Sequence, residues 1–312
     1  MAPPPASLPT LRTAAEDDLP ALTALAAAAL VHDADAPDVL RLLWDQDGGH
    51  PGLRLVADSG GDLLGTALGH LRPATGERPA TGFLDLVAVH PDAQSRGIGR
   101  ALLTRLEQEL TAAGATRLLV RGRPPAYAWP GVDIRYTRAV CLLASSGYTR
   151  LPEGLNMHVD LATAPLDTEA DVERLAAAGV TVRRMAADDA GLGLLDWIAR
   201  FGGSWAGEAE RALAHRTPRG HVAVREGDGG APEYVGFACH GVNRRSWFGP
   251  MGTEAAERGL GIGTVLLRRC LADQRAAGLA EAEIGWTDPI HFYARGVDAT
   301  LGRVFWPYEK QL

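Results

Sequence analysis

Two glycine clusters in this chain have the residue types and spacing that could bind phosphate groups. They read Gln94-Ser95-Arg96-Gly97-Ile98-Gly99 and Arg258-Gly259-Leu260-Gly261-Ile262-Gly263. Each cluster precedes an apolar stretch that should form a helix, and the free N–H groups at the start of a helix can bind an anion. Glycines also let a phosphate approach the backbone, because they have no Cβ. Two such clusters suggest a duplicated domain that binds a nucleotide cofactor.

The two clusters belong to a longer internal repeat. Gly97 and Gly261 are 164 positions apart, and at the same offset Ala112-Ala113-Gly114 matches Ala276-Ala277-Gly278. Upstream, the segment from Leu11 to Asp18 resembles the segment from Val182 to Asp189 at an offset of 171. The change of offset means that the second half is seven residues shorter between its first strand and its glycine loop, as expected if a loop is shorter there. We therefore expect two like-folded domains, at 1–161 and 180–312, joined by a linker at 162–179.

The elements that must position the two loops are readable from the pattern of apolar residues. A nearly continuous apolar run at 83–89 predicts a buried strand before the first loop, and 246–253 is its counterpart. Helices should follow the loops, each closed by a glycine. The segment 155–161 should be the last strand of the first domain, and 1–7 should be a disordered tail.

The bulk properties exclude several classes of protein. The chain has 312 residues, a net charge of −7 and a pI of about 5.7, without a basic stripe, so nucleic acid is not expected as a partner. Cys141, Cys239 and Cys270 are widely spaced, which favours small buried residues over a metal site or disulfides. No secretory signal or membrane-spanning stretch is expected. We expect a cytoplasmic monomer or homodimer without a membrane partner.

Taken together, these motifs make the chain similar to the GCN5-related N-acetyltransferase (GNAT) family, in tandem form. The similarity rests on the loop Arg/Gln-x-x-Gly-x-Gly, on the strand and turn 86–91 before the first loop, and on the opening segment 11–19. It implies an α/β (α+β) fold of two tandem GNAT-like domains, each a mixed, mostly antiparallel sheet with helices on both faces. It also implies an acyltransferase that uses acetyl-CoA and a small-molecule amine.

The resemblance assigns the cofactor contacts to the strand and loop of each half. A backbone amide of the strand would polarise the thioester carbonyl, and the loop would hold the pyrophosphate. The implied residues are Val87, Val89, Gln94, Arg96, Gly97, Ile98 and Gly99 in the first half, and Met251, Thr253, Arg258, Gly259, Gly261, Ile262 and Gly263 in the second.

The catalytic groups that the resemblance implies are divided between the halves. Asp85 stands where the family often has a base, but Gly249 occupies the matching place in the second half. Tyr293 stands where the family often has a general acid, but Leu143 occupies the matching place in the first half. Because Tyr293 could protonate the leaving thiolate, the C-terminal half is expected to be the catalytic one.

Each of these residues also has a purely structural interpretation. Asp85 could be an ordinary strand residue, and Tyr293 could be a packing aromatic. Tyr127 and Trp129 belong to an aromatic turn that could shape an acceptor pocket or pack between the halves.

Two functions from different classes therefore stay open. The favoured one is an acetyl-CoA-dependent N-acetyltransferase, and the other is a non-catalytic acyl-CoA-binding protein with degenerate GNAT domains. A dinucleotide-dependent oxidoreductase fits less well, since its Gly-x-Gly-x-x-Gly loop follows the first strand of a parallel unit. The sequence does not name the acceptor amine.

Overall fold

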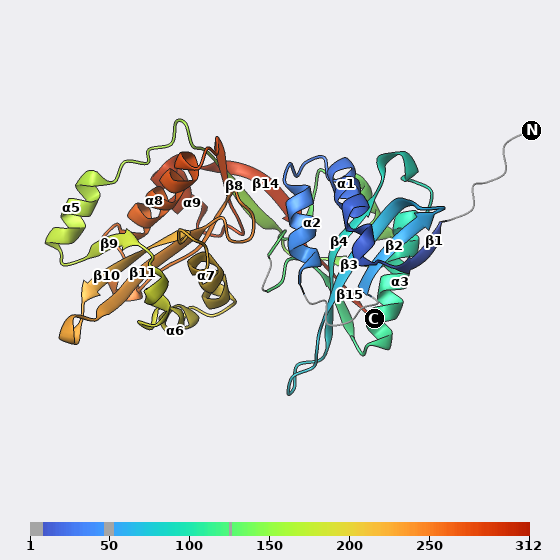
Figure 1. Cartoon of the computed structure of the whole chain (residues 1–312), viewed down its shortest axis with the longest axis horizontal. Helices are drawn as coiled ribbons and strands as arrows, with labels where there is room; N and C mark the ends of the chain where they lie inside the picture. The colour runs from blue at the N-terminus through green and yellow to red at the C-terminus, as the bar shows by residue number, and fades with distance from the viewer. Residues whose placement is uncertain (1–8, 47–52, 125–126) are drawn as a thin grey trace, which may run out of the picture. The chain divides into compact units, whose positions relative to one another are not determined.

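The computed structural model describes residues 9–46, 53–124 and 127–312, which form two compact units (Figure 1). The first unit takes its residues from Met1–Gly154 and Phe305–Leu312, and the second takes them from Leu155–Val304. The expected tail at 1–7 lies outside the described residues.

The first unit is a seven-stranded sheet with helices on both faces. The strand order is β1-β2-β3-β4-β5-β15-β7. The strands are β1 (Thr10–Thr13), β2 (Arg54–Ser59), β3 (Asp62–Arg72), β4 (Thr81–Val89), β5 (Arg117–Val120), β7 (Thr149–Arg150) and β15 (Tyr308–Gln311), with the short β6 (Val132–Asp133) outside this sheet. The helices are α1 (Leu19–Ala29), α2 (Ala36–Trp44), α3 (Ile98–Ala112) and α4 (Thr137–Ser145).

Two hydrophobic clusters hold these helices to the sheet. One cluster packs α3 against strands from β2 to β15 through residues such as Leu102, Leu106 and Leu118. The other joins α1 and α2 to the sheet through residues such as Leu22 and Leu40. Burial of these side chains, each worth about 1.5–3 kcal/mol, fixes the sheet between two helical layers.

The second unit repeats this plan. Its sheet runs β14-β8-β13-β12-β11-β10-β9. The strands are β8 (Gly154–Asp160), β9 (Thr181–Arg184), β10 (Gly220–Glu226), β11 (Pro232–His240), β12 (Trp247–Thr253), β13 (Glu281–Ile284) and β14 (Thr300–Trp306). The helices are α5 (Glu169–Ala177), α6 (Leu194–Ala199), α7 (Trp205–Leu213), α8 (Ile262–Ala276) and α9 (Ile290–Val297). One cluster includes residues of α5, α8 and α9, and another includes residues of α6 and α7.

The internal repeat corresponds to an equivalent Arg–Asp ion pair at the start of each unit. Arg12 donates to both carboxylate oxygens of Asp18 at 2.7 and 2.9 Å, and Arg183 donates to both oxygens of Asp189 at 2.8 and 2.5 Å. Each carboxylate also accepts the backbone N–H three residues before it, at 2.8 and 2.7 Å. Helices α3 and α8 have 15 residues each. The fold class expected from the sequence is therefore confirmed.

The division of the chain differs from the expected one in two places. The strand expected to close the first domain, now β8, lies in the second unit and pairs antiparallel with β13. In exchange, β15 lies in the first sheet, between β5 and β7. The expected linker at 162–179 contains α5, whose Leu175 is fully buried in the second unit.

The ion pair at the start of the second unit should make its stability depend on pH. Burial disfavours the charged form of Asp189, but hydrogen bonds from Arg183, the Ala186 N–H and Tyr234 outweigh it and hold the pKa below its ordinary value. The unfolded carboxyl takes up a proton near pH 3.9. This contribution to stability is therefore complete above about pH 4 and is lost as the pH falls through the lower folded-state pKa.

We predict that Asp189→Asn lowers the stability of the second unit at pH 7 by about 2 kcal/mol, because a buried charge-assisted network is broken. The same variant should also weaken the loss of stability below pH 4. Denaturant unfolding between pH 3 and 7 measures both effects, with the exposed neighbour Asp188→Asn as the matched control. An unchanged pH dependence in Asp189→Asn would contradict this assignment.

Candidate active site

A cavity of about 800 Å³ lies within the first unit. Its wall comes from the connection between α1 and α2, the second half of β4, the first glycine loop, the chain after β5, and α4. Most of these wall residues lie within 28–33, 84–89, 94–100, 120–122, 128–135 and 136–145, and Leu43, Pro91 and Ala93 complete the wall. A cavity of this size lies within the range of small-molecule sites.

The cavity opens where β4 separates from β5. The two strands run parallel and pair only at Thr81, Gly82 and Phe83. Beyond Phe83, β4 remains paired with β3, with a bulge between the pairs of Leu84 and Leu86. Among the described residues, the edge of β4 that faces away from β3 therefore has no strand partner over the stretch that lines the cavity. That edge includes the predicted contact residues Val87 and Val89.

The first glycine loop forms one end of the cavity. Gly97 has φ 85° and caps α3, a conformation that glycine adopts without steric cost. The N–H of Ala101 donates to the Gly97 carbonyl at 3.0 Å, so the preceding N–H groups lie ahead of the helical ladder. Gln94 donates to the Val89 carbonyl at 3.1 Å and accepts a hydrogen bond from Arg138.

Most of the residues predicted for this half lie on the wall. Gln94, Gly97, Ile98 and Gly99 line the cavity, whereas Arg96 is exposed and is not among the lining residues. Cys141, expected to be buried, is exposed and lines the cavity, and Cys239 and Cys270 are buried as expected.

Asp85, the predicted base, lies at the bulge of β4 in an ion pair. Arg123 donates from Nη2 to Oδ2 at 2.9 Å and from Nε to Oδ1 at 3.1 Å. Their side chains are 3% (Arg123) and 4% (Asp85) exposed. Burial raises the pKa of Asp85, and the charge and hydrogen bonds of Arg123 oppose that rise. No feature of the sequence indicates Arg123, which is 38 residues away.

A second polar group on the wall is not indicated by any motif in the sequence. Asp33 is 4% exposed and accepts hydrogen bonds from Trp129 Nε1 at 3.1 Å and from the Tyr136 hydroxyl at 2.8 Å. The His32 N–H donates to the same hydroxyl at 3.0 Å. The aromatic turn noted in the sequence thus contributes Trp129 to the cavity wall. Asp33 and Tyr136 are 103 residues apart, so no local spacing could connect them.

The second glycine loop has the same backbone geometry but different surroundings. Gly261 has φ 84° and caps α8, and the Val265 N–H donates to its carbonyl at 3.2 Å. Arg174 of α5 extends over this loop and donates to the Leu260 carbonyl at 2.7 Å. A Cβ built on Gly261 would lie 2.8 Å from Arg174 Nη2.

The other residues predicted for the second half lie around this loop. Arg258 and Gly259 are exposed, Ile262 is in the hydrophobic core, and Thr253 pairs with Gly236 in the sheet. A Cβ on Gly263 would lie 3.3 Å from Met251 and 3.3 Å from Phe292.

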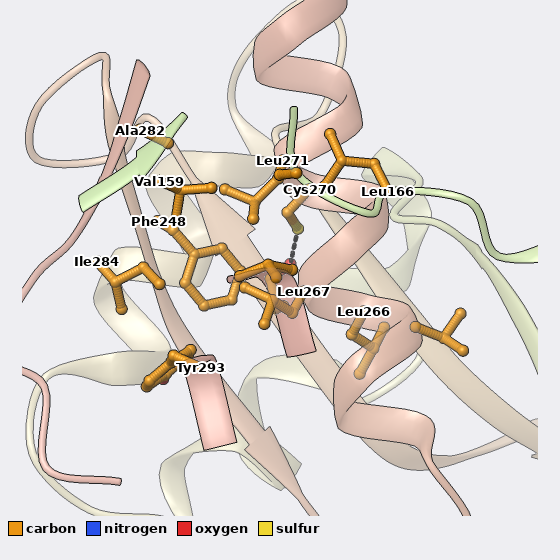
Figure 2. Packing of buried hydrophobic residues seen from close by; sticks show 14 of the residues in the cluster. Val159, Leu166, Phe248, Leu266, Leu267, Cys270, Leu271, Ala282, Ile284 and Tyr293 are labelled. Carbon is orange, nitrogen blue, oxygen red and sulfur yellow. Dashed lines mark hydrogen bonds between the residues drawn. The ribbon is translucent and has the colours of Figure 1, made fainter. Parts of the chain in front are cut away.

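Tyr293, the predicted general acid, lies in the core of the second unit (Figure 2). It is 7% exposed, and its ring forms edge contacts with Phe248 at 6.2 Å and Phe292 at 5.0 Å between ring centroids. Burial raises the pKa of its hydroxyl to about 12. The phenol is therefore protonated at neutral pH, as an acid must be, but its ring has the surroundings of a packing residue.

Part of the chain is similar in sequence to a known family. Residues 19–128, about a third of the chain, match the Acetyltransferase (GNAT) family. An L-2,4-diaminobutyric acid acetyltransferase from Nocardia farcinica is 40% identical over 77 residues, which are 25% of this chain and 37% of that protein. An acetyltransferase from Sodalis glossinidius is 42% identical over 74 residues, 23% of this chain and 48% of that protein. The chain thus spans less than half the length of these two relatives.

Solved structures extend the likeness to the whole chain. A GCN5-related N-acetyltransferase from Sphaerobacter thermophilus has a TM-score of 0.65 at 18% identity, covering 97% of this chain and 95% of that one. A tandem GNAT protein from the clavulanic acid biosynthesis pathway has a TM-score of 0.63 at 17% identity, covering 97% and 98%. At such identities the likeness concerns the fold. The chain therefore has the fold of tandem GNAT proteins, and its sequence matches the GNAT family over residues 19–128.

Two further properties concern the described residues only. None of their helices combines the length and apolar character needed to cross a bilayer. None of their His, Cys, Asp and Glu side chains form a group of three or more that could hold a metal ion.

Proposed function

We propose that this chain is an acetyl-CoA-dependent N-acetyltransferase for a small-molecule amine, with its active site in the first unit. The observation that carries the proposal is the cavity that connects the glycine loop, the unpaired edge of β4 and the Asp33–Tyr136 group. The sequence favoured the second unit because of Tyr293. The geometry favours the first unit, because Arg174 extends over the second loop and Tyr293 lies in a hydrophobic core.

The residues of the cavity fit acetyl-CoA, which would supply the acetyl thioester. The N–H groups ahead of Ala101 and the start of α3 would bind the pyrophosphate. Arg100 and Arg138 on the same wall add positive charge. An N–H on the free edge of β4 would donate to the thioester carbonyl and stabilise the oxyanion that develops during attack.

The group that receives the proton of the amine should also lie on the wall. Asp85 is committed to Arg123, so we assign this role to Tyr136, whose hydroxyl donates to Asp33 at 2.8 Å. Tyr136 would take the proton of the amine as it passes its own proton to Asp33. The C–N bond forms as the C–S bond breaks. The amide nitrogen and the Asp33 carboxyl are then both neutral, and the negative charge leaves with the thiolate of CoA.

Turnover with a panel of amines tests the proposed function. The protein, acetyl-CoA and each amine are mixed, and the free thiol of CoA is detected. Thiol release that depends on one class of amine supports an acetyltransferase. Tight binding of acetyl-CoA without thiol release for any amine would favour the alternative, a non-catalytic acyl-CoA-binding protein.

We predict that Tyr136→Phe lowers kcat by about 10²-fold, the usual contribution of a positioned acid or base. The affinity for acetyl-CoA should change little, because the ring remains in place. Tyr293→Phe is the matched control and should retain its turnover, since it removes a hydroxyl from the second unit. Steady-state kinetics of the two variants measure this difference. A large loss of kcat in Tyr293→Phe alone would instead place the active site in the second unit.

A further inference from the structure

The ion pair of Asp85 and Arg123 bridges the opening between β4 and the chain that follows β5. β4 and β5 pair no further than Phe83 and Leu119. Asp85 lies two residues beyond this last pair on one strand, and Arg123 lies four residues beyond it on the other. We propose that this ion pair is a tie that sets the width of the opening, and that Asp85 is a positioning residue instead of the base. This inference rests on the proposed function, since it assumes that acetyl-CoA reacts at the edge of β4.

The hydrogen bonds of Arg123 show how completely the tie is made. Its Nε and Nη2 donate to the carboxylate of Asp85, and its Nη1 donates to the Pro124 carbonyl at 3.1 Å. The chain is also fixed on the far side, because the Gly122 N–H donates to the Trp129 carbonyl at 2.7 Å. The guanidinium therefore connects β4 to a segment that includes a wall residue of the cavity.

The same contacts make Asp85 a poor base. Both of its oxygens accept hydrogen bonds from Arg123, and the pair is almost fully buried. If Asp85 took up a proton, the Arg123 charge would be left in the interior without its counter-charge, which is costly. To act as a base, this carboxylate would have to give up a hydrogen bond from Arg123, whereas its geometry already suits it to hold β4 in place.

The second unit provides a comparison within the same molecule. The residue that matches Asp85 is Gly249, and a Cβ built there would meet no atom within 4 Å. The parallel pairing of β12 with β13 ends at Phe248 and Ile284, and the aromatic ring of Tyr293 packs against Phe248. The Asp85–Arg123 ion pair therefore occurs in the same unit as the cavity, at the point where β4 diverges from β5.

Three variants separate a tie from a base. Asp85→Asn and Arg123→Met each remove one partner, and the double variant Asp85→Leu/Arg123→Met replaces the pair by apolar groups, which buried sites often accept without loss of folding. Asp92→Asn is the control, since that carboxylate is 93% exposed on the same unit. Each folded variant is assayed for kcat, for KM and for the pH dependence of kcat/KM.

If the pair is a tie, the two single variants should lower kcat/KM by a similar factor, about 10²-fold for a misplacement near 1 Å. The double variant should lose no more than either single variant, since the tie can be lost only once. The apparent pKa of the ascending limb of the pH profile should be the same in all of them. Loss of that limb in Asp85→Asn, with turnover kept in Arg123→Met, would overturn the proposal and make Asp85 the base.

A readout without turnover keeps the proposal testable if no amine is acetylated. Hydrogen exchange of the peptides that cover 84–89 and 118–124 should be at least about tenfold faster in Arg123→Met and in the double variant than in the wild-type protein, as expected for local opening of a tied segment. Wild-type exchange in both variants would overturn the tie. If the wild-type protein releases no thiol with any amine, but the variants exchange faster than the wild-type protein, then the proposed function is refuted and the tie is supported.

Discussion

Deletion of residues 307–312 should unfold the first unit and leave the second unit folded. These residues contain β15, which lies between β5 and β7 and pairs through four residues with β5 and through two with β7. Tyr308 is 3% exposed and belongs to the core cluster of that unit. Loss of a buried aromatic costs about 3–5 kcal/mol, and loss of the strand adds its ladder of hydrogen bonds, so the total is comparable to the stability of a domain. Hydrogen exchange and calorimetry of the truncated chain measure the effect.

A substitution in β15 distinguishes the contribution of the strand from that of its ion pair on the surface. Lys310 donates to Glu107 at 2.8 Å, and both side chains are partly exposed. Lys310→Met keeps the strand and removes this ion pair, so it should cost no more than about 1 kcal/mol. A truncated chain in which the first unit still unfolds cooperatively at the wild-type temperature would contradict the role assigned to β15.

Gly97→Val should strongly weaken the binding of acetyl-CoA and lower the proposed turnover with it. Gly97 has φ 85°, a conformation that a β-branched residue adopts only with strain. The loop would therefore leave the geometry in which its N–H groups point at a phosphate. Loss of two charge-assisted hydrogen bonds of about 1.5–3 kcal/mol each corresponds to a loss of affinity of at least about 10²-fold. Calorimetric titration with acetyl-CoA measures it.

The second loop supplies a matched control for that variant. Gly261 has φ 84°, so Gly261→Val places the same backbone strain at the same position of the repeat. If the first unit holds the site, Gly261→Val should bind acetyl-CoA and turn over almost as the wild-type protein does. The reverse result, with binding lost only in Gly261→Val, would assign the cofactor to the second unit, as the sequence alone suggested.

Much of the fold could be predicted because it depends on local patterns. The glycines at 97 and 261, the apolar helices after them and the repeated Arg–Asp pairs are visible as residues at a fixed spacing. The exchange of β8 and β15 between the sheets could not be predicted. The two sheets are alike, and the residues of a strand do not indicate which of two like sheets the strand joins. β15 in particular is short and mostly polar, with Tyr308 as its one buried residue.

The site was predicted only in part, since its important contacts are distant in sequence. The loop residues and Asp85 were identified from their place in a motif. The pairing of Asp85 with Arg123, and of Asp33 with Tyr136, depends on how the chain after β5 folds back toward β4. The position of Arg174 over the second loop also depends on where α5 packs. From the sequence, that segment is predicted to be part of a linker.

Hydrogen exchange with and without acetyl-CoA tests the central claim most directly, because it reports which loop binds the cofactor without requiring an acceptor. We predict that acetyl-CoA slows the exchange of backbone N–H groups at 94–101 and along 84–89, and leaves those at 258–265 as in the free protein. Protection confined to 258–265 would contradict the assignment of the active site to the first unit.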